Sequence, residues 1–238
     1  TRASGDYSTA MGYSTEASGY SSTAMGLNTT ASGVYSTAMG SNTKASADYS
    51  TAMGRSTTAS DYGSLVIGQY NSSGSTPTSA DSFDTANTAF VIGNGTVDVA
   101  KDAFKVMFNG DTTVSNDLTV NGNVMVSSDA RLKANIVSLG ATLAKLLLID
   151  GKSYTMKKDG KQKIGVLAQD IQKVFPELVS TDDRDMLAVN YQGLVPVLIN
   201  ALKEQQADID ELKEQAAQMK EQEKRLERLE AIISKMDK

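Results

Sequence analysis

Hydrophobic and polar positions repeat every fourteen residues through the first seventy residues of the chain. Each of the first four copies contains Ser-Thr-Ala-Met-Gly and the fifth contains Ser-Leu-Val-Ile-Gly, which aligns Met11, Met25, Met39, Met53 and Ile67, each followed by a glycine. A fixed short period with one apolar ladder and one glycine ladder is typical of a β-solenoid. Because fourteen is even, strand parity is kept from copy to copy and each ladder stays on one face. The pattern therefore predicts an all-β roll over residues 1–72.

Coils of this kind contain few large side chains, so they cannot build a substantial core alone and favour burial against other chains. Three coils around a common axis would provide that burial. The array resembles the head repeats of trimeric autotransporter adhesins, which have a similar Ser-x-Ala-x-Gly period. The resemblance implies a left-handed parallel β-roll that assembles as a homotrimer.

Rows of serine and threonine also permit an ice-binding or ligand-binding face, although these residues suit exposed strand positions by propensity alone. Tyrosine recurs as Tyr7, Tyr35 and Tyr49, but Ser21 stands at that position in the second copy, which argues against a tyrosine-based site. The Gly-Gly-x-Gly-x-Asp period of calcium-binding solenoids is absent from the sequence. We expect no metal and no cofactor.

Residues 73–88 are polar and rich in turn formers, and we interpret them as a long loop that is a candidate for contact with a receptor. Residues 89–127 return to short apolar alternations, such as Leu118-Thr119-Val120, separated by Asn-Gly pairs at 94, 109 and 121. Asn-Gly between such alternations is a strong turn signal, so three short strands forming a β stalk are predicted.

The stretch Ser128-Asp129-Ala130-Arg131-Leu132-Lys133 places a serine five residues before a lysine in a chain without histidine or cysteine. Without imidazole or thiol, nucleophilic chemistry must use a hydroxyl activated by a lysine amine or a carboxylate. A Ser-Asp pair ahead of Arg-Leu-Lys is also an ordinary helix N-cap, so a purely structural role stays open on these residues alone.

Downstream segments change this picture. Residues 164–171 read Ile-Gly-Val-Leu-Ala-Gln-Asp-Ile, residues 174–179 read Val-Phe-Pro-Glu-Leu-Val, and residues 189–191 read Val-Asn-Tyr. With the Ser-Asp-x-Arg-Leu-Lys opening, this order resembles the C-terminal intramolecular chaperone domain of phage tailspikes, endosialidases and neck appendages. The resemblance covers about residues 128 to 206.

The resemblance implies a homotrimer that guides a β-rich upstream domain into register and then cuts itself off before the motif serine. Ser128 would be the nucleophile, Lys133 the general base and Ser127-Ser128 the broken bond, with Asp129 and Arg131 as capping or positioning residues. A lysine acts as a base only when neutral, which in general requires desolvation or neighbouring positive charge. An N-to-O acyl shift followed by ester hydrolysis is the hypothesis for the chemistry.

The C-terminal residues 198–238 predict one long helix with Leu202, Ile209, Leu212, Ala216 and Met219 at heptad a and d spacing. Continuing that register places Glu223 at an a position, whereas Leu226, Leu229 and Ile233 define a pattern shifted by three residues, as a stammer would. A solvated amphipathic helix is the alternative to the predicted coiled coil, which would follow a chaperone and peptidase domain at 128–197.

Charge is distributed unevenly. Residues 128–238 contain eighteen basic and eighteen acidic residues, so residues 1–127 carry the whole net charge of −5. A basic nucleic-acid surface is not indicated. No apolar run approaches the roughly 18 residues of a membrane span, and the chain lacks a basic-then-apolar start. We expect no nucleic-acid partner and no membrane insertion. Because Thr1 already lies inside a repeat, we expect the chain to be a fragment of something longer.

Together these patterns predict a mixed fold: a trimeric β-roll and β stalk, then an α+β chaperone domain ending in a long trimeric coiled coil. We expect a fragment of a phage-type tail fibre or tailspike, assembled in the host cytoplasm and located in the virion. The further expected partner is a host-surface receptor of unknown identity. A non-cleaving structural trimerisation or adhesion module is the alternative.

Overall fold

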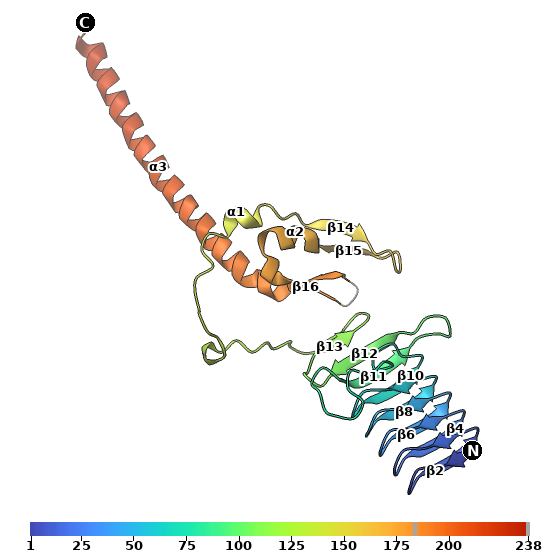
Figure 1. Cartoon of the computed structure of the whole chain (residues 1–238). Helices are drawn as coiled ribbons and strands as arrows, with labels where there is room; N and C mark the ends of the chain where they lie inside the picture. The colour runs from blue at the N-terminus through green and yellow to red at the C-terminus, as the bar shows by residue number, and fades with distance from the viewer. Residues whose placement is uncertain (183–184, 237–238) are drawn as a thin grey trace. The chain divides into compact units, whose positions relative to one another are not determined.

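The computed structural model describes residues 1–182 and 185–236, and the chain forms two compact units, residues 1–126 and 127–238 (Figure 1). The last two residues of the predicted coiled coil, 237 and 238, lie outside the described part. We describe each unit by itself.

The first unit is a β-solenoid in which each coil contributes one short and one long strand. The short strands are β1 (Arg2–Ala3), β3 (Glu16–Ala17), β5 (Thr30–Ala31), β7 (Lys44–Ala45) and β9 (Thr58–Ala59), and the long ones are β2 (Thr9–Tyr13), β4 (Thr23–Leu27), β6 (Thr37–Ser41), β8 (Thr51–Arg55) and β10 (Leu65–Gln69). Each strand pairs in parallel with its equivalent in the next coil, so that Met11 lies opposite Met25. The predicted solenoid and its fourteen-residue register are confirmed.

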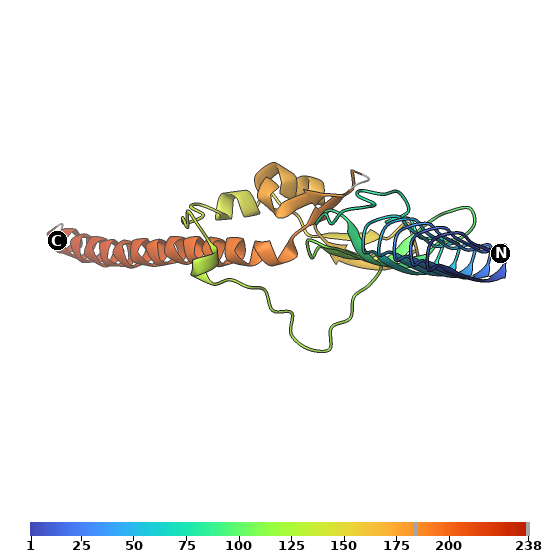
Figure 2. The ribbon, with the colours of Figure 1, turned by 60° about the horizontal axis from the view of Figure 1, so that its bottom comes forward.

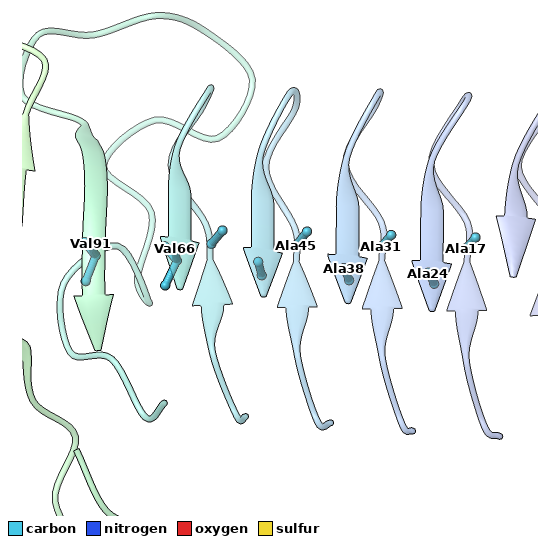
Figure 3. Close-up of a cluster of buried hydrophobic side chains, with 9 residues drawn as sticks. Ala17, Ala24, Ala31, Ala38, Ala45, Val66 and Val91 are labelled. Atoms are coloured by element: carbon cyan, nitrogen blue, oxygen red, sulfur yellow. The ribbon is translucent and has the colours of Figure 1, made fainter. Parts of the chain in front are cut away.

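Alanine fills the space between the two sheets. Ala17 and Ala31 of the short strands and Ala24 and Ala38 of the long strands are fully buried, and Val66 and Val91 continue the row (Figure 3). Because side chains alternate along a strand, the threonine and methionine that flank each buried alanine in the long strands point to the outer face. Met11 accordingly remains 55% exposed. The roll therefore has a narrow core of small side chains and an apolar outer ladder.

The glycine ladder follows from the tight stacking of the coils. Gly40 has φ +125°, which L side chains rarely adopt, and a Cβ built on it would lie 2.0 Å from the carbonyl oxygen of Gly54 in the next coil. Only glycine permits this backbone conformation and this approach.

Five tyrosines form one continuous row along the roll, which corrects the expectation drawn from Ser21. Tyr20, one residue before Ser21, contacts Tyr7 and Tyr35 with ring centroids 5.5 and 5.6 Å apart. Tyr62 likewise contacts Tyr49 at 5.2 Å, and Tyr49 contacts Tyr35 at 5.1 Å. Two neighbouring backbone positions thus deliver rings to the same row, which a strict fourteen-residue comparison misses.

The long sheet continues past the repeats. Strand β11 (Thr88–Asn94) pairs in parallel with β10, with Val66 opposite Val91, 25 residues later, and residues 71–87 form the inserted loop. The buried Asp61 carboxylate holds this loop by accepting hydrogen bonds from the backbone N–H groups of Thr78 (2.7 Å) and Thr88 (2.8 Å). The buried Asp61 side chain of the roll therefore fastens the loop to the end of the roll.

Two antiparallel strands, β12 (Asp102–Met107) and β13 (Thr112–Val114), complete the eight-stranded sheet. Residues 115–126, all of them described, contain no strand, so the predicted strand around Leu118–Val120 is wrong. Leu118 is 70% exposed. Apolar alternation alone therefore does not make a strand here.

The second unit is a small α+β fold. It contains η1 (Ala130–Leu132), α1 (Leu143–Leu146), the hairpin of β14 (Lys152–Thr155) and β15 (Gln162–Gly165), α2 (Ala168–Val174), η2 (Pro176–Leu178), the hairpin of β16 (Val179–Thr181) and β17 (Leu187–Val189), η3 (Tyr191–Gly193) and α3 (Leu194–Met236). Ile171 of α2, Phe175 directly after α2 and Val197 of α3 form its buried core. The Gly-x-x-Ala-Gln and Phe-Pro-Glu-Leu-Val motifs therefore supply packing residues.

Helix α3 runs without interruption for 43 residues, about 65 Å at 1.5 Å per residue. Pro196 is tolerated because it lies in the first turn, where backbone N–H groups have no helical partner. Leu202, Leu212 and Met219 are each more than 60% exposed, as expected of a coiled-coil face in a single chain. The predicted long C-terminal helix is confirmed.

Candidate functional site

The predicted scissile bond lies in irregular chain at the boundary between the two units. Ser127 and Ser128 have no regular secondary structure, and the 3-10 helix η1 begins two residues later. The unit boundary falls between Val126 and Ser127, so a cut after Ser127 would separate almost the whole second unit from the roll.

The structure brings Ser128 and Lys133 together. The Lys133 ammonium donates a hydrogen bond to the Ser128 hydroxyl, with Nζ and Oγ 2.6 Å apart. Helix η1 folds the five-residue spacing back on itself, since the Lys133 backbone N–H donates to the Ala130 carbonyl at the end of the turn. This distance is within reach for proton transfer between a nucleophile and its base.

Asp129 caps η1, as the sequence indicated for a Ser-Asp start. Its Oδ1 accepts from the Arg131 backbone N–H (2.8 Å) and from Nε (3.1 Å), and its Oδ2 accepts from Nη2 (2.7 Å). The side-chain bonds from Arg131, followed by the backbone bond, lower the pKa of the Asp129 carboxyl, and the same pair raises the pKa of Arg131. Both residues thus hold the turn that joins Ser128 to Lys133, and neither faces the hydroxyl in any contact of the described residues.

Both members of the Ser128–Lys133 pair are exposed in the single chain. A lysine amine in water is protonated at neutral pH, whereas a base must be neutral. The geometry therefore supplies proximity, and the exclusion of water from the pair is not a property of one isolated chain.

A contact that the sequence did not reveal ties this segment to the long helix. The Glu204 carboxylate on α3 accepts from the backbone N–H of Thr142 (2.6 Å) and of Leu143 (3.1 Å) and from the Thr142 hydroxyl (3.1 Å). The Thr142 backbone bond contributes most to the lowered pKa of Glu204. Glu204 thereby caps α1 from 62 residues away, and no local spacing rule could have identified the pair.

Among the described residues, no group of three or more acidic, histidine or cysteine side chains is arranged to hold a metal ion. Within the same residues, no helix is both long and apolar enough to cross a membrane.

Comparison with known proteins bears on both units. A family model described as chaperone of endosialidase matches residues 128–180 and begins at Ser128. Residues 128–180 are thus similar to the chaperone-of-endosialidase family. The model of the YadA head domain repeat matches residues 3–29, 31–57 and 45–71. Both predicted resemblances are confirmed, and the region similar to the endosialidase chaperone starts at Ser128, which contacts Lys133.

Curated relatives are phage proteins named long tail fiber protein Gp37. The chain is 29% identical to that of Salmonella phage S16 over 149 residues, which is 57% of this chain and 20% of the relative. It is 34% identical to that of Enterobacteria phage Ox2 over 106 residues, 39% of this chain and 42% of the relative. The relative from Escherichia phage AR1 is 34% identical over 34% of this chain and 8% of its own length. The chain thus spans less than half the length of these relatives.

Proposed function

We propose that this chain is part of a homotrimeric phage tail fibre whose endosialidase-chaperone domain directs assembly of the β-roll and then cuts the chain between Ser127 and Ser128. The names of the curated relatives support the fibre assignment and a place in the virion. The matched family is described as a peptidase as well as a chaperone, which supports cleavage as the type of reaction.

The observation that carries the proposal is the 2.6 Å contact between Lys133 Nζ and Ser128 Oγ at the first residues of the endosialidase-chaperone domain. In the proposed reaction, neutral Lys133 takes the hydroxyl proton as Oγ attacks the carbonyl carbon of Ser127. The Ser127–Ser128 C–N bond breaks, an ester forms on Oγ, and the proton passes to the freed amine of Ser128. Water then hydrolyses the ester, which leaves a carboxylate on Ser127 and restores the hydroxyl.

In this proposal, assembly of the trimer excludes water from the Ser128–Lys133 pair. The heptad leucines of α3 are exposed in one chain, as are Met11 and Met53 of the outer methionine ladder, and both faces match the requirements of a three-chain bundle. Packing of three chains would remove water from around Lys133 and favour its neutral form, because desolvation disfavours the charged amine. Cleavage is then delayed until the trimer has formed.

Intact mass measurement of freshly purified protein tests the cleavage. We expect fragments that correspond to residues 1–127 and 128–238, absent in Ser128→Ala and strongly reduced in Lys133→Ala, since one lacks the hydroxyl and the other the base. Lys133→Arg should also fail because a guanidinium stays protonated. Ser127→Ala is the matched control, since it keeps the scissile carbonyl and should still cut.

If Ser128→Ala and Lys133→Ala gave the same fragments as the parent, the assignment of the pair would be refuted. A second candidate function, a trimerisation module in which the pair is idle, is favoured by the exposure of both residues in the single chain. It predicts a trimer of intact mass after prolonged incubation.

A further inference from the structure

The second unit carries a large apolar edge with no cover in the single chain. Residues 134–141 lead from the Ser128–Lys133 pair into α1 without regular secondary structure. Along this segment Ile136 is 68%, Val137 83% and Leu139 51% exposed. Apolar side chains that cluster in this way usually mark an interaction surface.

The same unit contains an apolar pocket of about 480 Å³ between its two hairpins and the start of α2. Tyr154 and Met156 line it from one hairpin, Leu167 from the start of α2, and Leu187 and Val189 from the other hairpin. Asp185 is the one charged residue among the described residues that line it. The pocket therefore suits apolar side chains of an extended segment.

The apolar segment and the pocket lie on opposite flanks of the unit. In both views the chain that enters α1 departs on the side away from β14 and β15, which border the pocket (Figure 1 and Figure 2). Two different surfaces on opposite flanks make a head-to-tail contact, and such contacts close into a ring when the rotation fits. A three-chain bundle along α3 provides a rotation of that kind.

We propose that residues 136–139 of one copy dock in the pocket of the next copy around the trimer. The proposal rests on the homotrimer of the proposed function and names the surfaces that join its endosialidase-chaperone domains. A second copy is the fitting occupant because the chain itself supplies an uncovered apolar segment to match the uncovered apolar pocket. Ile136 follows Lys133 by three residues, so docking would also lay the neighbouring chain against the Ser128–Lys133 pair.

Disulfide trapping tests the contact directly, because the chain has no cysteine of its own. Val137→Cys combined with Met156→Cys, in the uncut Ser128→Ala chain, should give covalent dimers and trimers on a non-reducing denaturing gel after mild oxidation. The matched control replaces Met156→Cys by Glu214→Cys, which lies on the exposed length of α3. This control should give no ladder.

The outcomes separate the two proposals. A parent that is monomeric by light scattering would overturn the homotrimer and the docking with it. If the parent is a trimer but the cysteine pair forms only a fast-migrating monomer band, or no disulfide, the docking alone would be overturned.

A second test uses the rate of cleavage. In the cleaving chain, Val137→Asp should slow cleavage by about tenfold or more, given that general-base catalysis contributes roughly 10²–10⁴. Val97→Asp, at a similarly exposed valine between β11 and β12 of the first unit, should leave the cleavage rate unchanged. Restoration by adding Met156→Lys would support the contact, and unchanged cleavage in Val137→Asp would refute it.

Discussion

Four glycine substitutions separate the two reasons why the roll requires glycine. Gly40 combines φ +125° with a Cβ position 2.0 Å from the next coil, whereas Gly110 has φ +94° and nothing within 4 Å. Gly33 lacks the positive φ but would place a Cβ 1.9 Å from the Ala47 carbonyl oxygen, and Gly122 has neither constraint. Alanine therefore introduces backbone strain alone at Gly110, a steric collision alone at Gly33, both at Gly40 and neither at Gly122.

The expected magnitudes follow from these distances. Gly110→Ala should cost about 1–3 kcal/mol of backbone strain. Gly33→Ala must move the facing oxygen from 1.9 Å to at least the 3.4 Å of ordinary contact, a shift of about 1.5 Å that breaks neighbouring backbone bonds such as Ser32 N–H to Ala45 O (2.9 Å). With roughly 1 kcal/mol net per bond, two lost bonds cost about 2 kcal/mol. Gly40→Ala should then cost about 3–5 kcal/mol as the sum of both terms.

Urea unfolding of the uncut Ser128→Ala protein, followed by circular dichroism of the β signal, measures the series. The expected order of destabilisation is Gly40 largest, Gly33 and Gly110 intermediate and Gly122 near zero. A Gly40→Ala protein as stable as Gly122→Ala would refute the close stacking of the coils.

Three further outcomes are expected. Thr43→Val should raise the free energy of unfolding by about 1 kcal/mol or more, because the buried Thr43 hydroxyl has no hydrogen-bond partner. Ser36→Ala should lower the free energy of unfolding, since the Ser36 hydroxyl donates to the Gly33 carbonyl at 2.7 Å. Changes of the opposite sign in both variants would contradict these hydrogen-bond assignments for the two hydroxyls. Glu204→Gln should speed hydrogen exchange at the Thr142 and Leu143 amides. In the parent, the same loss of amide protection should appear only as the pH falls below the usual carboxyl range. The pKa of Glu204 is lowered in the folded chain, so its stabilising contribution is present above that range and is lost as the folded-state carboxyl takes up a proton. Residues 1–127 expressed alone should aggregate or stay monomeric, and their efficient refolding to a trimer would remove the need for a chaperone domain.

Periodicity carried most of the fold because the even repeat fixes which side chain faces which neighbour. The glycine ladder and the heptad leucines of α3 could be located from spacing alone, whereas spacing did not reveal that alanine, and not methionine, fills the core of the roll. Contacts that break the period could not. Tyr20 reaches the tyrosine row from a shifted position, and Asp61, which replaces the repeat glycine, anchors a loop that follows it in sequence. Glu204 and Thr142 meet across 62 residues without any motif.

The site divides in the same way. The Ser128–Lys133 approach follows from a single short turn, so it was accessible from the sequence. Exclusion of water from the pair would depend on packing between chains, and a local sequence pattern does not predict such contacts. The apolar residues after Lys133 signalled nothing in the sequence because their spacing fits neither a strand nor a helix.

The fourteen-residue register has a consequence for how such a shaft changes over generations. Because every coil presents the same faces to its neighbours, gain or loss of one whole repeat leaves all the ladders aligned and alters only the length, in steps of about 4.8 Å. Any insertion that is not a multiple of fourteen must instead be looped out, as residues 71–87 are. Recombination between repeats would thus change the length of the roll in small discrete steps, whereas new surface shapes would be added as inserted loops.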